Sequence, residues 1–228
     1  MAVWLVRAGR NGELEEFVVE NNQAVIGWDR LSDLSGVESR DELKAMCGDV
    51  YAERHPMAIA ILVGQLWAFR ERMSPRDLVV LPFKTRSGVA IGEVTGSYQY
   101  RPESAAGARH TRPVKWLRTD IPRSEFGQDL RYSLNAGMTV CRIKRNNAEE
   151  RIKAVLAGKP DPGLEDEEVI IEEIPDLEAY AREQIRDFIA RSFKEHELAH
   201  LVDDILKAQG YKTHLSPPGP DGGVDIIA

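Results

Sequence analysis

Residues Leu78 to Val94 read LVVLPFKTRSGVAIGEV, and this stretch contains two strand candidates. Leu78–Leu81 and Val89–Val94 are short runs rich in β-branched residues, and Pro82 and Gly88 lie between them. Further short strands are expected at Val3–Val6, Ala24–Trp28, Val114–Leu117 and Met138–Ile143. Many short strands with few helices predict a small mixed β-barrel.

Helices are expected beside these strands. Ser39 followed by Glu42 is a capping box, and it predicts a short helix with Leu43, Ala45 and Met46. Met57–Met73 is apolar on more than one side, so this helix should be buried. Shorter helices are expected at Ser124–Arg131 and Ala148–Ala157, and a long loop at Arg101–Pro113.

The net charge of −7 conceals an asymmetry along the 228 residues. Residues 1–145 carry 21 Lys and Arg against 18 Asp and Glu, whereas residues 146–228 carry 9 against 19. Asp161–Glu178 alone contains nine acids and no base, which is typical of a solvated linker. A basic module is therefore expected to precede an acidic one.

The two cysteines, Cys47 and Cys141, have no metal-ligand spacing, so reduced thiols in a cytoplasmic protein are expected. The N-terminus lacks the pattern of a signal peptide, and the longest apolar run, Met57–Val63, is too short to span a bilayer. Neither a membrane nor a small-molecule substrate is expected as a partner.

The first 145 residues resemble the PUA-like superfamily, in particular EVE domains and, more distantly, YTH domains. The segments that carry the resemblance are 24–29 (AVIGWD), 77–80 (DLVV), 91–98 (IGEVTGSY), 110–117 (HTRPVKWL) and 121–122 (IP). The resemblance implies a domain that flips one modified nucleobase into an aromatic pocket. The fold class implied for the whole chain is α+β: a PUA-like mixed barrel with flanking helices, a helical acidic linker, and the start of an α/β nuclease domain.

Candidate base-binding residues are Trp28, Asp29, Tyr98 and Tyr100. Trp28 follows a predicted strand and is either a wall of the pocket or a core tryptophan, while Asp29 offers an acceptor for an exocyclic amine. Tyr98 and Tyr100 are two residues apart and would face the same way in an extended chain, as a second wall or as surface tyrosines.

A series of basic residues on and after the long loop predicts contacts to the phosphates of a nucleic acid. The candidates are Arg101, Arg109, His110, Arg112, Lys115 and Arg118. The alternative for any one of them is an ordinary solvated side chain.

The segment from Phe193 to the end resembles the opening of the Mrr-type restriction endonuclease domain, a branch of the PD-(D/E)xK nucleases. It holds a helix with Glu197, then Gly210-Tyr211, then the string Asp-Gly-Gly-Val-Asp at 221–225. The resemblance implies Glu197 and Asp225 as catalytic carboxylates that bind Mg²⁺, a hard cation that prefers such oxygens. The alternative for Asp225 is a surface acid beside a turn.

The nuclease family also requires a strand with a catalytic lysine, and the sequence reaches Ala228 before one. The chain is therefore expected to be truncated and inactive in cleavage. A competing interpretation takes His196-Glu197-Leu198-Ala199-His200 as an HExxH zinc site, for which a third ligand such as His214, Asp221 or Asp225 would be needed.

The sequence thus predicts a modification-dependent, type IV restriction endonuclease with a role in phage defence. Its domains are expected at 1–145 (EVE/PUA-like reader), 146–190 (helical acidic linker) and 191–228 (incomplete Mrr-like nuclease). The expected partner is double-stranded DNA that carries a modified base. The sequence leaves open whether two copies of the chain form a homodimer. The alternative is a reader of modified RNA without nuclease activity.

Overall fold

The computed structural model describes residues 1–144, 147–163 and 196–216, together with residues 181, 185–186, 188–189, 192–193 and 226–228. The chain divides into two compact units, Met1–Asp176 and Leu177–Ala228. Predictions that fall on residues 164–180 and 217–225, including the acidic stretch beyond residue 163 and Asp225, lie outside the described residues.

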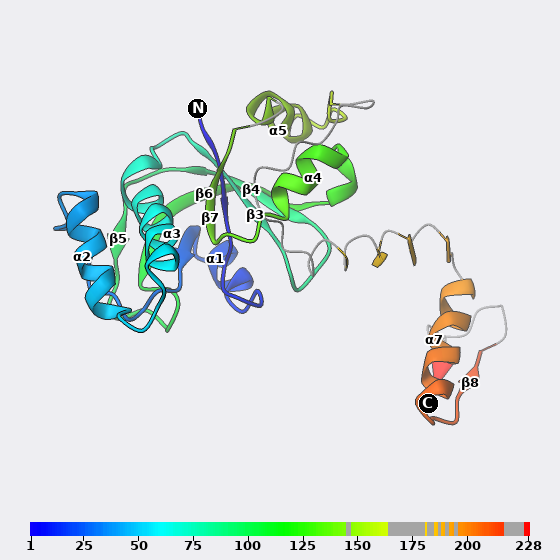
Figure 1. The fold of residues 1–228 in the computed structure, drawn as a ribbon. Helices are drawn as coiled ribbons and strands as arrows, with labels where there is room; N and C mark the ends of the chain where they lie inside the picture. Colours follow the sequence, from blue (N-terminus) through cyan, green and yellow to red (C-terminus); the bar gives the residue numbers. More distant parts are fainter. Residues whose placement is uncertain are drawn as a thin grey trace. The chain divides into compact units, whose positions relative to one another are not determined.

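A curled, half-barrel sheet forms the centre of the first unit (Figure 1). Its strands are β1 (Val3–Val6), β2 (Gln23–Ile26), β3 (Leu78–Pro82), β4 (Val89–Val94), β5 (Gln99–Tyr100), β6 (His110–Ile121) and β7 (Val140–Ile143). They follow the order β2-β6-β4-β3-β1-β7, with β5 also paired to β6. Only the β1–β3 pair is parallel among the strand pairs of this described sheet.

Both faces of the central strands are buried, which explains their nearly continuous apolar sequences. In β1, Trp4 and Val6 pack into one core, whereas Val3 and Leu5 pack into a second core on the opposite face. The same alternation continues in β3 and follows from the two-residue period of a strand. The sheet therefore needs helices on both faces.

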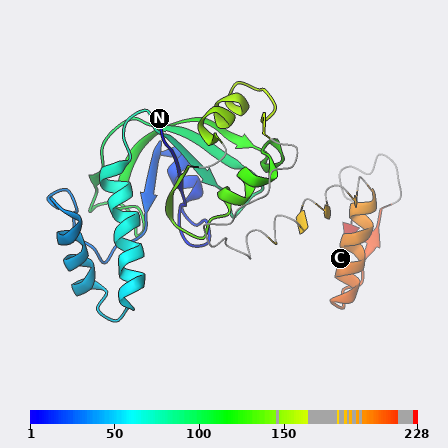
Figure 2. The ribbon, with the colours of Figure 1, turned by 45° about the horizontal axis from the view of Figure 1, so that its top comes forward.

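A helical hairpin covers the first face (Figure 2). It consists of α2 (Arg40–Val50) and α3 (Pro56–Trp67), and a π-helical turn, Ala68–Arg72, extends α3. The predicted cap is confirmed, since Ser39 Oγ accepts a hydrogen bond from the Glu42 amide at 3.1 Å. The prediction of a buried helix at Met57–Met73 is wrong at its start, where Met57 is 69% and Ile61 51% exposed, because only one side of α3 meets the sheet.

Two further helices cover the second face (Figure 1). They are α4 (Gln128–Leu134), which follows a 3-10 turn at Arg123–Glu125, and α5 (Ala148–Leu156). Ile152 and Val155 of α5 are fully buried against the sheet. Although the sequence suggests that a linker begins at residue 146, α5 packs as part of the first unit.

A buried arginine joins α5 to α4 and to the chain that follows it. Arg151 donates hydrogen bonds to both carboxylate oxygens of Asp129 (2.6 and 2.9 Å) and of Asp161 (2.6 Å each). Asp161 also accepts from the amides of Gly127 and Gly163. Residues 158–163 are thereby held on the first unit.

The long strand β6 is the main departure from the predicted secondary structure. The sequence predicts a loop to Pro113 and a strand only at Val114–Leu117, but β6 begins at His110. Its first residues pair with β2 on one side and with β5 on the other, and its later residues pair with β4. Proline and charged residues are unfavourable in strands, so the sequence does not predict the start of β6. In the structure, pairing with strands on both sides stabilises it despite these residues.

The second unit contains α7 (His196–Ala208), β8 (His214–Leu215) and β9 (Ile226–Ile227). The two strands pair antiparallel, and Asp203 on α7 accepts hydrogen bonds from Lys207 Nζ and Thr213 Oγ1. The expected helix is thus present in the described residues, and Gly210 and Tyr211 lie between it and β8. Nowhere in the described part of the chain is a helix long and apolar enough to cross a membrane.

Candidate nucleic-acid interface

Four of the predicted site residues meet where β2 ends and β6 begins. His110 is paired with Ile26 of β2 and with Tyr100 of β5, so the pairing of three strands fixes its position. The rings of Tyr98 and Tyr100 lie 6.0 and 5.1 Å from the His110 ring, measured between centroids. Asp29, in the loop after β2, also acts electrostatically on His110. These residues, Asp29, Tyr98, Tyr100 and His110, are called the His110 cluster below.

His110 is completely buried, and burial lowers the pKa of its imidazole. Its Nδ1 lies 2.7 Å from the Tyr98 hydroxyl, which also accepts a hydrogen bond from the Leu34 amide at 3.3 Å. A buried hydroxyl proton needs an acceptor, and His110 Nδ1 is within reach. We therefore assign the proton of neutral His110 to Nε2.

The cluster contains two buried polar atoms without partners among the described residues. These are His110 Nε2 and Asp29 Oδ1. The second carboxylate oxygen of Asp29 accepts a hydrogen bond from the Gly107 amide, which fixes the end of the loop before β6. Buried donors and acceptors almost always have partners, so an unpaired donor beside an unpaired acceptor favours a binding role over a purely structural one.

The aromatic candidates differ in exposure. Tyr98 is buried, and burial raises the pKa of its hydroxyl to about 12. Trp28 and Tyr100 are half-buried, and both pack against the core beneath helices α2 and α3. Trp28 lies two residues beyond the end of β2, so it is neither a strand residue nor fully buried in the core. Trp28 and Tyr100 are therefore the two aromatic candidates that reach the surface.

Arg112 has a different environment from that of a phosphate-binding side chain. It is buried, and its guanidinium donates to the carbonyl oxygens of Phe69, Gly96 and Arg70. Burial lowers its pKa to about 10. Its position indicates that it stabilises the π-helical turn after α3, an effect that a basic loop sequence does not reveal.

The other basic candidates lie nearer to solvent. Arg101 and Lys115 are exposed, and Arg109 is half-buried with an Nε atom that lacks a partner in the described chain. Arg118 is half-buried and donates to the Val155 carbonyl of α5 at 3.1 Å. The structure thus places Arg101, Arg109 and Lys115 where a phosphate could reach them more readily than it reaches Arg112.

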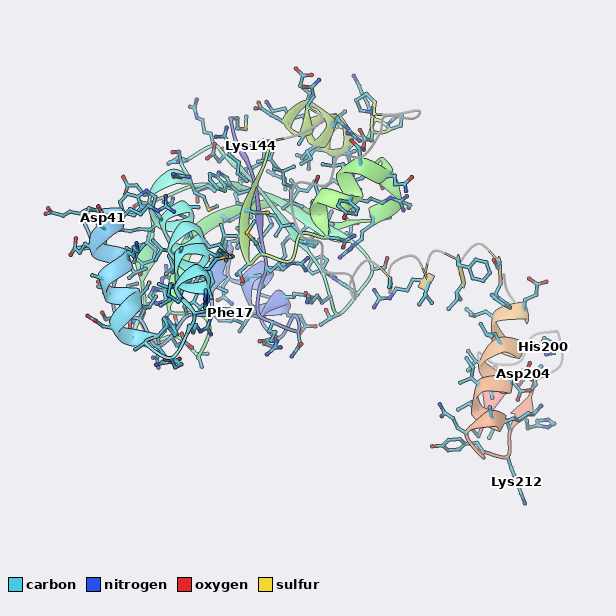
Figure 3. All side chains as sticks on the ribbon, in the orientation of Figure 1. Phe17, Asp41, Lys144, His200, Asp204 and Lys212 are labelled. Carbon is cyan, nitrogen blue, oxygen red and sulfur yellow. The ribbon has the colours of Figure 1, made fainter. Side chains whose placement is uncertain are left out.

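The second unit contains the predicted nuclease carboxylate Glu197. It lies exposed in the first turn of α7, and His200 and Asp204 project from the same helix (Figure 3). Its proposed partner Asp225 is outside the described residues. Within the described part of the chain, no three His, Cys, Asp or Glu side chains are placed to hold a metal ion. The described residues therefore give no support to the zinc interpretation and do not by themselves form a magnesium site.

Together these features define an α+β protein with a curled sheet domain and a short second unit that contains α7, β8 and β9. Residues 4–143 match the family model described as a domain of unknown function, DUF8426, and the chain belongs to that family. Residues 190–228 match a second model, described as restriction endonuclease. No curated protein matches the chain.

The second match establishes a restriction-endonuclease-like C-terminus in this chain. Such a domain implies binding to DNA, and this family generally uses divalent metal ions.

Proposed function

We propose that this chain is part of a modification-dependent restriction endonuclease whose first unit recognises a modified base in DNA. We place the reader at residues 1–163, because α5 and the Arg151 ion pairs belong to the sheet domain, and the nuclease segment from about residue 190. The main support is the His110 cluster, which holds an unpaired buried donor and acceptor beside two half-buried aromatic rings.

In this proposal a flipped base stacks on Trp28 or Tyr100 and hydrogen-bonds to the cluster. Extrusion of a base costs a few kcal/mol, and stacking on an aromatic side chain returns about 1–3 kcal/mol per base. Asp29 Oδ1 would accept from an exocyclic amine, and His110 Nε2 would donate to a ring nitrogen or carbonyl. The base thereby satisfies two polar atoms that have no described partner.

Discrimination of a modified base needs more than the burial of a methyl group. One methyl contributes only about 0.8 kcal/mol, which is less than a tenfold preference. Larger selectivity requires polar groups that an unmodified base leaves poorly matched. Asp29 is the residue of the cluster best suited to this task, because its position is fixed by the Gly107 amide.

The basic side chains around the His110 cluster are proposed to bind the phosphates of the DNA backbone. Arg101, Arg109 and Lys115 are the favoured phosphate ligands, and Arg118 is a weaker candidate because α5 already binds its guanidinium. Arg112 is left out of this set, since its guanidinium is buried against three carbonyl groups. Because side chains that neutralise phosphates release counterions from the DNA, the affinity for DNA should fall as the salt concentration rises.

For the nuclease segment we propose that Glu197 and Asp225 hold Mg²⁺, as the resemblance implies. When bound, the ion would polarise the scissile phosphate and activate a water molecule. Glu197 is exposed on α7, so its carboxylate is accessible to such an ion.

Binding of matched oligonucleotides tests the reader. Fluorescence anisotropy would compare DNA and RNA that contain cytosine, 5-methylcytosine, adenine or N6-methyladenine in one sequence context. We expect tighter binding to one modified DNA, a loss of about tenfold or more in Trp28→Ala, and near-normal binding in Trp28→Phe, which keeps a stacking surface. Binding to modified RNA alone would instead establish an RNA reader, and equal binding to all probes would remove the base-reading proposal.

A further inference from the structure

Residues 31–37 lie over the His110 cluster. Leu31, Leu34 and Val37 are each buried, and they join the core that contains Tyr98. The backbone groups of Leu31 and Trp28 lie close enough to the imidazole of His110 to raise its pKa by hydrogen bonding, against the larger opposite effect of burial, although none of them makes a well-directed hydrogen bond to Nε2. His110 has no exposed surface in this arrangement, although its Nε2 has no partner in the described chain.

This segment is held mainly by side chains rather than by a strand ladder. It lies between the end of β2 at Ile26 and the N-cap of α2 at Ser39. The backbone hydrogen bonds described for it are local turns, from Leu31 to Trp28 and from Val37 to Leu34. Segments without ladder bonds can open at lower free-energy cost than the sheet that they cover.

Two side chains fasten the middle of the segment. Arg70, on the π-helical turn, donates from Nε to the Leu34 carbonyl at 2.7 Å and from Nη2 to the Ser35 carbonyl at 3.1 Å. The Tyr98 hydroxyl accepts from the Leu34 amide. Three of the contacts that keep the segment closed therefore converge on two neighbouring residues, Leu34 and Ser35.

The two residues just before the segment have separate anchors. Asp29 accepts from the Gly107 amide, and Arg30 binds Glu53 and the Val50 carbonyl at the end of α2. Gly36 has open space around its α-carbon, with no heavy atom near the position of an added Cβ. Movement of residues 31–37 is therefore expected to leave Asp29 and Arg30 in place.

We propose that residues 31–37 form a lid, fastened by Arg70 and Tyr98, which must open before a nucleobase can reach His110. The inference rests on the proposed base-reading function, because it names the step that admits the base. In the closed state the lid replaces the ligand by filling the space beside His110 with Leu31 and Leu34. In the open state His110 Nε2 and Asp29 Oδ1 become available together.

The lid can be tested on the full chain without any nucleic acid. Diethyl pyrocarbonate modifies accessible imidazoles, and mass spectrometry would give the rate separately for His110 and for exposed His55. We expect Arg70→Gln to raise the His110 rate at least tenfold, because charge-assisted hydrogen bonds hold the lid. The matched control is Arg72→Gln, an exposed arginine on the same turn, which should leave the His110 rate unchanged.

Hydrogen exchange separates lid opening from general unfolding. In Arg70→Gln the amides of residues 31–37 should exchange faster while those of β3 keep the wild-type rate. Tyr98→Phe, which removes a single hydroxyl, should have the same effect on residues 31–37 to a smaller extent. An unchanged His110 rate in Arg70→Gln, or equal acceleration in the lid and in β3, would overturn the proposal.

An oligonucleotide arm distinguishes failure of the lid from failure of the reader. If the modified DNA binds, Arg70→Gln should raise its association rate several-fold, and a rate equal to that of the wild type would contradict the lid. If none of the oligonucleotides binds, the base-reading function fails, while the modification and exchange rates without DNA still decide whether residues 31–37 open.

Discussion

Removal of the Arg151 guanidinium should be among the most damaging single changes in the first unit. Arg151→Gln would leave the carboxylates of Asp129 and Asp161 buried without the four hydrogen bonds that now balance their charges. Loss of one partner from a buried ion pair costs about 3–5 kcal/mol, a large share of the roughly 5–15 kcal/mol that stabilises an ordinary domain. Urea unfolding followed by tryptophan fluorescence would measure the loss.

The pH dependence gives this prediction a specific signature. Burial opposes ionisation, but the hydrogen bonds from Arg151 outweigh it and lower the pKa of both Asp129 and Asp161. Their contribution to stability is therefore complete above the ordinary aspartate pKa and is lost as the pH falls through the lowered values. In Arg151→Gln the unpaired carboxylates should protonate more readily, so the difference between wild type and variant should shrink as the pH falls from about 7 to about 4.

Lys153→Gln provides the matched control on the same helix. Lys153 pairs with Glu149 at the surface, where ion pairs contribute little, so this variant should unfold like the wild type. A loss below about 1 kcal/mol in Arg151→Gln, or a difference that does not vary with pH, would refute the assignment of Arg151 as the centre of a buried charge network.

Three further predictions concern the sheet domain. Gly92→Ala should destabilise it by about 1–3 kcal/mol, because the added carbon would meet Val114, Trp116 and the backbone of β6; a Tm equal to that of the wild type would contradict this. Arg112→Gln should lower the Tm, since a neutral amide cannot replace a guanidinium bound to three carbonyls, yet leave the salt dependence of DNA binding unchanged; a reduced salt slope would return Arg112 to the interface. Burial lowers the pKa of His110, so its contribution to stability is complete above about pH 6.5 and falls with pH below that, by at most about 1.4 kcal/mol per pH unit; His110→Gln should remove this slope in urea titrations.

The sheet was predictable where side chains on both faces are apolar. β1 (VWLV) and β4 (VAIGEV) have the bounds that their sequences predict, because short and mostly apolar runs of this kind are stable in a sheet that is covered on both faces. The start of β6 was not predictable, since Thr111 and Pro113 alternate with His110 and Arg112, a pattern that suggests an exposed basic loop. The environment that buries His110 and Arg112 comes from residues far away in the sequence, including Phe69, Gly96 and Tyr98.

The candidate site was predictable in its residue types and less so in its geometry. The sequence places Trp28, Asp29, Tyr98 and Tyr100 as candidates, and the structure adds His110 to the last three as one cluster. The sequence predicted that His110 binds phosphate, whereas its complete burial in the structure favours a role inside the cluster. Arg70 and the segment that it holds were missed, because neither forms a sequence motif; the apolar spacing of Leu31, Leu34 and Val37 was the available signal.

The position of β1 has a consequence for how the domain is made. β1 pairs with β3, about 75 residues later, and with β7, about 140 residues later. Contacts between residues so distant in sequence slow folding, because the entropy of closing long loops is lost before the contacts are gained. β1, which precedes both of its partners in the sequence, is thus among the last strands of the described sheet to be fully paired. Until β7 is available, one edge of this apolar strand stays open to other chains, so slow synthesis of residues 80–140 would favour aggregation over folding.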